Sequence, residues 1–76
     1  MITGYPPGTG VSWNLKGTVT TGVIKRVIRH SATVKVNGEL VRVEVDGAPA
    51  YVVERHTGER FIMHHREVIT DPRVYS

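Results

Sequence analysis

The feature that most constrains the fold is the stretch "ATVKVNGELVRVEV" at residues 32–45. Apolar residues alternate with polar ones on both sides of the pair Asn37-Gly38. Alternation with a period of two is typical of a strand with one buried face, and Asn-Gly accepts the positive φ angles of a two-residue type I′ turn. The stretch therefore predicts an antiparallel β-hairpin that turns at residues 37–38.

The rest of the chain repeats this pattern of short strands and turns. Turn signals rich in Gly and Pro recur at short intervals, and mostly Val, Ile, Thr and Tyr lie between them. A second hairpin is predicted over residues 50–64, with Thr57-Gly58 at its turn. Its alternating apolar residues are Tyr51, Val53, Phe61 and Met63. The sequence "HHREV" at residues 64–68 predicts one helical turn that leads into a last short strand.

The stretch "GVIKRVIRH" at residues 22–30 has apolar residues on both faces. The pairs Val23-Ile24 and Val27-Ile28 recur at a helical spacing of four, but the run of β-branched residues favours a strand. A strand that is apolar on both faces fits a strongly bent sheet, where it contributes to both walls of a small barrel. The expected core residues are Val11, Val23, Val27, Val34, Val43, Val53 and Met63.

Five to six short antiparallel strands therefore predict an all-β fold, a small open barrel or roll. The expected organisation is a flexible N-terminal tail over residues 1–9, a single domain over residues 10–70 and a C-terminal tail over residues 71–76. With 76 residues, such a domain has a thin core. The chain has no cysteine, which excludes a disulfide and suits a cytoplasmic location. No apolar run approaches the length of a membrane span, so we expect no membrane contact.

The positive charge is concentrated in the first half of the chain. Residues 1–38 contain five basic residues and no acidic one, whereas residues 39–76 contain five basic and seven acidic residues. Clustered Lys and Arg can bind a phosphate backbone, so a surface for a polyanion is one interpretation. The other is that oppositely charged strands lie side by side and cancel. The adjacent Lys25 and Arg26 are expected on opposite faces of a strand, which weakens a single basic stripe.

Several short motifs resemble one known family. They are "VSWN" at residues 11–14, Gly17, Gly22-Val23, Val27, "PAYVVE" at residues 49–54, and His64 followed by Val68. Over residues 10 to about 69 the chain resembles the small Tudor-type domain named after hypervirulence-associated proteins. The resemblance implies an SH3-like β-barrel of Tudor type, with a second strand that starts near Thr20 and a loop over residues 14–21. The family brings no established ligand or reaction.

Trp13, the only tryptophan, has two possible roles. As a core anchor it packs at the open end of the barrel, with its indole N–H bound to an acceptor. Alternatively, Trp13, Tyr51 and Phe61 form an aromatic cage for a methylated ammonium group. In so small a domain, packing in the core is the simpler explanation for these rings.

Metal binding and catalysis have little support in the sequence. The four histidines, His30, His56, His64 and His65, show no zinc-ligand spacing, and we expect His64 to be partly buried. Ser12 has no identifiable base partner, and no Gly-rich phosphate loop precedes a helix. We therefore expect no metal, no cofactor and no enzymatic activity, with a small enzyme assembled from several copies as a minor alternative.

The sequence thus predicts a non-enzymatic binding module whose partner is nucleic acid or a protein. The alternative is a structural or assembly subunit that self-associates through an edge strand; the oligomeric state itself is not readable from the residues. The expected ligand-binding residues are Trp13, Lys16, Lys25, Arg26, Arg29, Lys35 and Tyr51.

Overall fold

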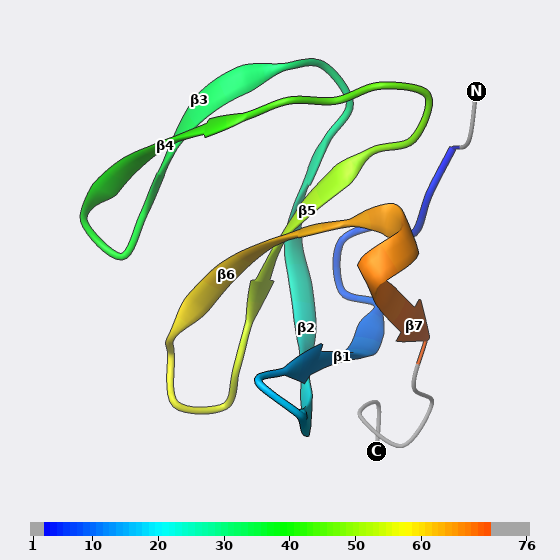
Figure 1. Ribbon diagram of the computed structural model, residues 1–76, viewed down its shortest axis with the longest axis vertical. Coiled ribbons are helices and arrows are strands. Elements are labelled where there is room, and N and C mark those ends of the chain that lie inside the picture. Colours follow the sequence, from blue (N-terminus) through cyan, green and yellow to red (C-terminus); the bar gives the residue numbers. More distant parts are fainter. Residues whose placement is uncertain (1–2, 71–76) are drawn as a thin grey trace.

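The computed structural model describes residues 3–70, which form an all-β fold (Figure 1). The all-β class with antiparallel strands is confirmed. The elements are β1 (Gly10–Leu15), β2 (Thr18–Ile28), β3 (Ala32–Val36), β4 (Glu39–Val43), β5 (Ala50–Glu54), β6 (Arg60–His64), the 3₁₀ turn η1 (His65–Glu67) and β7 (Val68–Thr70).

Five strands form one sheet in the order β6-β5-β2-β1-β7, and every neighbouring pair is antiparallel. The strands β3 and β4 form a separate two-stranded sheet between β2 and β5 in the chain. This is the predicted Asn-Gly hairpin, since Asn37 and Gly38 both have positive φ angles, of 52° and 83°. The second predicted hairpin is confirmed as β5 and β6.

The turn between β1 and β2 is shorter than the family resemblance implied. Lys16 and Gly17 have φ angles of 51° and 85°, so the chain reverses in two residues. Leu15 then pairs with Thr18, and β2 begins there. The expected loop over residues 14–21, with a strand start near Thr20, is therefore wrong. Positive φ at both turn residues matches the twist of the strands and lets the ladder continue up to the turn.

The strand β2 runs through the centre of the molecule and contributes to two cores, as its two apolar faces predicted. The first core cluster consists of Val11, Trp13, Ile24, Tyr51, Val53 and Val68. The second lies under the β3–β4 hairpin and consists of Ile28, Val34, Val36, Val43, Ala50 and Val52. Of the seven expected core residues, Val11, Val34, Val43 and Val53 are buried, whereas Val23, Val27 and Met63 are partly exposed.

A β-bulge divides β2 between these two cores. Ile24 pairs with Val53 and Arg26 pairs with Val52, so that Lys25 is the extra residue on β2. A bulge places two residues opposite one and bends the strand locally. The bend lets β2 leave the first core and enter the second.

Residues 3–9, which fall in the expected N-terminal tail, lie against the sheet. The backbone N–H of Gly8 donates to the Ile24 carbonyl at 2.7 Å, and the Ile24 N–H donates to the Thr9 carbonyl at 3.0 Å. The Tyr5 ring stacks on Tyr51 with 5.9 Å between ring centroids. The expected tail over residues 71–76 lies outside the described residues.

Candidate functional site

Trp13 is a core residue rather than a surface for a ligand. Its side chain lies in the first core cluster and is 3% exposed, and its ring meets Phe61 at a centroid distance of 5.8 Å. The core-anchor interpretation is confirmed. The expectation that the indole N–H donates to an acceptor is wrong, because Nε1 is buried without a hydrogen-bond partner among residues 3–70. The strand pairing of Trp13 with Thr20 and Val68 fixes the ring in the core, where apolar contacts surround it.

Tyr51 is also buried, and its hydroxyl joins two segments. The hydroxyl oxygen accepts the backbone N–H of Tyr5 at 3.0 Å and lies 2.6 Å from Nδ1 of His65. Burial raises the pKa of Tyr51 above its ordinary value, because it disfavours the phenolate. Since neither Trp13 nor Tyr51 offers an open ring face, the two rings cannot build an aromatic cage with Phe61.

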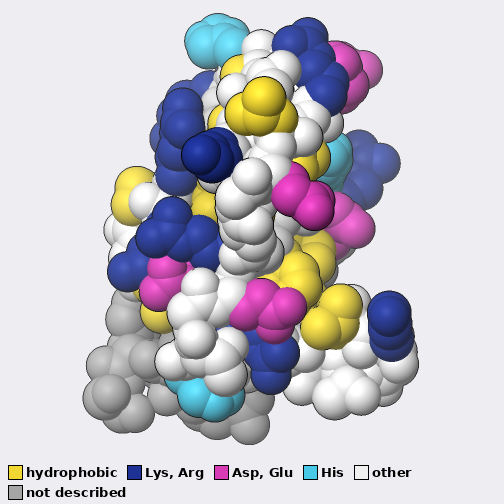
Figure 2. Space-filling view, turned by 90° about the vertical axis from the view of Figure 1, so that its left-hand side faces the viewer, with side chains coloured by type: hydrophobic (Ala, Val, Ile, Leu, Met, Phe, Trp, Pro, Cys, Tyr) yellow, Lys and Arg dark blue, Asp and Glu magenta, His cyan; other side chains and the backbone are white. Residues whose placement is uncertain are grey.

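Three of the expected basic residues meet at one hollow beside β2 and β3. Lys25 and Arg26 on β2 and Lys35 on β3 line a hollow of about 380 Å³, together with Arg60 from the start of β6. Two valines, Val34 and Val52, complete its lining. We call this site the basic hollow. Figure 2 shows several Lys and Arg side chains exposed on this side of the molecule, some of them beside Asp or Glu side chains.

The bulge at Lys25 explains why adjacent residues share this hollow. In a regular strand Lys25 and Arg26 would point to opposite faces, as the sequence suggested. The register shift between Ile24 and Arg26 removes that alternation, and both side chains are exposed and line the same site. The expectation that they diverge is therefore wrong.

The basic hollow carries an excess of positive charge. Arg60 pairs with Glu54, with 2.8 Å between Nε and Oε2. No ion pair within the described part of the chain involves Lys25, Arg26 or Lys35. Three cationic side chains therefore project from three neighbouring positions without a paired carboxylate, which is an arrangement suited to an anion.

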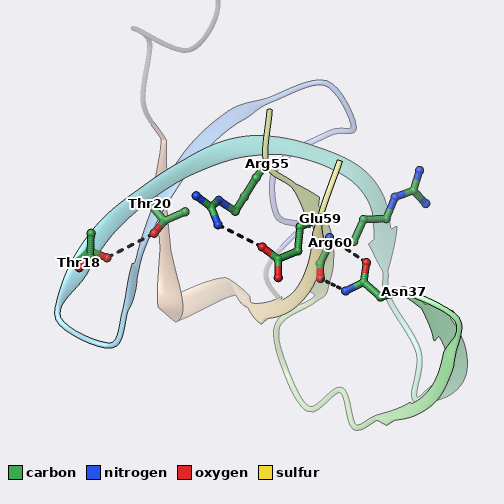
Figure 3. A network of polar contacts seen from close by, with 6 residues as sticks. All are labelled: Thr18, Thr20, Asn37, Arg55, Glu59 and Arg60. Atoms are coloured by element: carbon green, nitrogen blue, oxygen red, sulfur yellow. Dashed lines mark hydrogen bonds and ion pairs between the residues drawn. The ribbon is translucent and has the colours of Figure 1, made fainter. Parts of the chain in front are cut away.

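Arg60 is a site residue that the sequence analysis did not single out. Its position depends on Asn37 at the turn of the β3–β4 hairpin. The Asn37 side chain donates to the Arg60 carbonyl at 2.7 Å and accepts the Arg60 N–H at 3.1 Å, which attaches the hairpin to β6 (Figure 3). Asn37 is readable as a turn residue, but nothing in the sequence signals this second role.

The other two expected basic residues lie apart from the basic hollow. Lys16 is exposed at the turn between β1 and β2. Arg29 donates to the Thr3 carbonyl and lines a different hollow, about 260 Å³, together with Asp46 and Pro49. The structure thus brings together Lys25, Arg26 and Lys35, and separates them from Lys16 and Arg29.

Comparison with known protein families shows which family the chain belongs to. The family model described as "Hypervirulence associated proteins TUDOR domain" matches residues 8–68. The chain belongs to this Tudor-domain family. The match covers β1 to the start of β7, so both cores and the basic hollow lie within the Tudor domain. Searches among curated proteins and among solved structures find no match.

The histidines of this Tudor domain do not converge. No group of three or more His, Cys, Asp or Glu residues within residues 3–70 has the geometry to hold a metal ion. His64 is exposed, so the expectation that it is partly buried is wrong; its neighbour His65 is the half-buried one, because it contacts Tyr51. Among the described residues, no helix is long and apolar enough to cross a membrane.

Proposed function

We propose that this Tudor domain is a non-enzymatic, cytoplasmic binding module whose partner is nucleic acid, bound through its phosphates at the basic hollow. The observation that carries the proposal is the convergence of Lys25, Arg26, Lys35 and Arg60 on one hollow. Cations gathered on one face attract a phosphate backbone and release its condensed counterions. The lining offers no carboxylate or imidazole as a general base, which favours binding over catalysis. The chain's lack of cysteine supports the cytoplasmic location.

The test is a titration of the ¹⁵N-labelled protein with mixed-sequence DNA, followed by amide chemical shifts at low and at near-physiological salt. We expect shifts at Lys25, Arg26 and Lys35 that weaken steeply as salt rises. Arg26→Gln should lower the slope of log affinity against log salt by about one, because one phosphate contact is lost. Arg66→Gln is the matched control, since Arg66 lies on η1 and lines a separate hollow.

The same titration separates nucleic acid from a protein partner. If DNA and RNA cause no shifts at low salt, the proposal fails. Shifts at the basic hollow with a poly-glutamate peptide, but not with nucleic acid, would indicate an acidic protein segment instead. Shifts centred on Arg66 would place the binding surface elsewhere.

A second candidate is self-association through an edge strand, and the strand β4 favours it. Within the described residues β4 pairs only with β3, and Leu40 on β4 is 76% exposed. An open strand edge beside an exposed apolar side chain can pair with another copy. The expected result is a mass that rises with concentration and returns to that of the monomer in Leu40→Glu; a constant mass would exclude this candidate.

A further inference from the structure

Two further hollows lie next to the basic hollow along β2. The next one, about 340 Å³, shares Lys25 with it and is also lined by Thr21, Arg55 and His56. The third, about 200 Å³, shares Thr21, Arg55 and His56 with the second and reaches Thr18. We call these three adjacent hollows, which share lining residues, the β2 groove.

The β2 groove is long enough to hold an extended chain molecule. It follows β2 from Thr18 to Arg26. With a rise of ~3.3 Å per residue, this part of the strand spans ~26 Å. Figure 3 shows labelled residues arranged along this path, from Thr18 and Thr20 past Arg55 to Arg60 and Asn37.

Hydrogen-bond donors and cations line the whole path. Arg55 stands where the second and third hollows overlap, and Lys25 where the first and second overlap. The Arg55 Nη1 binds Glu59 at 3.1 Å, whereas its Nε is buried without a partner in the part of the chain that the structure describes. The hydroxyl of Thr21 adds a neutral donor in the stretch between the cations.

Glu54, which lines the second hollow, and Glu59 are both paired with arginines of the groove. Glu54 is paired with Arg60, and Glu59 with Arg55. Neither carboxylate therefore opposes an incoming phosphate with a full unpaired charge. The unpaired cations Lys25, Arg26 and Lys35 make the basic hollow the most positive part of the groove.

Among residues 3–70, no Phe, Tyr or Trp lines the three hollows, and the imidazole of His56 is the one ring there. Small barrels that bind single strands commonly stack bases on exposed aromatic rings, and such stacking is one source of base preference. Here the donors are cationic groups and hydroxyls, and where such groups bind phosphate and sugar oxygens they carry no sequence information. A single strand is flexible enough to follow a twisted β-strand, whereas a duplex is stiff over ~150 base pairs.

We propose that the partner is single-stranded nucleic acid, whose sugar-phosphate backbone lies along the β2 groove from Lys35 to Arg55 and is bound without base selectivity. This inference rests on the proposed function and extends it by naming the strandedness, the path and the lack of base preference. A span of ~26 Å corresponds to the short end of the ~4–16 nucleotides that a small barrel covers.

The experiment measures fluorescence anisotropy of labelled thymidine oligonucleotides, from about two to about twelve nucleotides long, with the full chain at low salt. Affinity should rise steeply with length until the groove is filled and only slowly thereafter. Arg55→Gln and Lys35→Gln, in different hollows of the groove, should each weaken binding of the longer oligonucleotides several-fold. Arg66→Gln should change the affinity for these oligonucleotides less than about twofold, because the charge that it removes lies outside the β2 groove. Trp13 fluorescence confirms that each variant is folded.

The outcomes separate this inference from the proposed function. Loss of binding in Lys35→Gln with none in Arg55→Gln would leave the basic hollow as a site and overturn the groove. Tighter binding of duplex than of a single strand of equal length would overturn the strandedness. A preference above about tenfold among homopolymers would overturn backbone-only recognition. If no oligonucleotide binds at low salt, both proposals fail together.

Discussion

The hydroxyl of Tyr51 is the contact whose removal gives the sharpest test of the structure. It accepts the Tyr5 N–H at 3.0 Å and forms a second hydrogen bond, of 2.6 Å, with Nδ1 of His65. The substitution Tyr51→Phe deletes both hydrogen bonds and keeps the buried ring. Each is worth ~0.5–1.5 kcal/mol, so we expect the free energy of unfolding to fall by about 2 kcal/mol. For a domain of this size, that lowers Tm by about 10 °C.

The assay is urea unfolding followed by tryptophan fluorescence. Trp13 is the only tryptophan and lies buried beside Phe61, so its emission reports the loss of the first core. Tyr5→Phe is the matched control, because it removes the same hydroxyl from a neighbouring ring that makes no side-chain hydrogen bond among the described residues. We expect the control to lose less than ~0.5 kcal/mol.

Two results would contradict this role of the Tyr51 hydroxyl. Equal losses in Tyr51→Phe and Tyr5→Phe would mean that the Tyr51 hydroxyl contributes no specific bond. A loss below ~0.5 kcal/mol in Tyr51→Phe would mean that water replaces both partners without cost. Hydrogen exchange at the Tyr5 amide gives an independent readout, since that amide should exchange faster only in Tyr51→Phe.

Three further predictions concern packing, the hairpin and pH. Gly22→Ala should lower the free energy of unfolding by ~1–3 kcal/mol in the same urea assay. The reason is that a Cβ at this position would lie 2.5 Å from the carbonyl oxygen of Glu54. An unchanged unfolding midpoint would contradict that close approach. Asn37→Gly keeps the turn but loses both hydrogen bonds to the Arg60 backbone. Because both bonds are exposed to water, we expect a total loss of only ~0.5–1.5 kcal/mol, with faster exchange of the Arg60 amide; a slow amide would speak against the attachment. The pKa of Tyr51 is raised in the folded state, because burial disfavours the phenolate. The contribution of the protonated hydroxyl to the free energy of unfolding is therefore fully present below the unfolded pKa of ~10, and it is lost as pH rises through the folded pKa. Stability measured from neutral to strongly alkaline pH should therefore fall less steeply in Tyr51→Phe, and parallel curves would count against this assignment.

The local units of the fold could be predicted because their signals lie within short stretches of sequence. The Asn37-Gly38 pair accepts positive φ, and the alternation beside it assigns one face to the core, so turn and register follow together. The same reasoning predicted the hairpin of β5 and β6 and the single turn before β7. The two-residue turn at Lys16-Gly17 was missed, because the family resemblance replaced its local signal with a loop.

The candidate site could be predicted only in part. The basic half of the chain was readable from composition, and three of its residues do share a hollow. Their convergence depends on the bulge at Lys25, which reverses the expected divergence from Arg26. A bulge forms where a bent strand serves two cores, and that demand comes from residues distant in the sequence.

The sequence alone determined the all-β class, the positions of the two hairpins and the burial of Trp13 as a core anchor. These follow from backbone preferences and from alternation, which act between residues a few positions apart. Only the tertiary structure decided that Arg60 joins Lys25, Arg26 and Lys35, and that the Tyr51 hydroxyl joins Tyr5 to His65. Such contacts connect strands that the chain brings together from far apart, and their geometry is set by packing of the whole sheet, which no short stretch encodes.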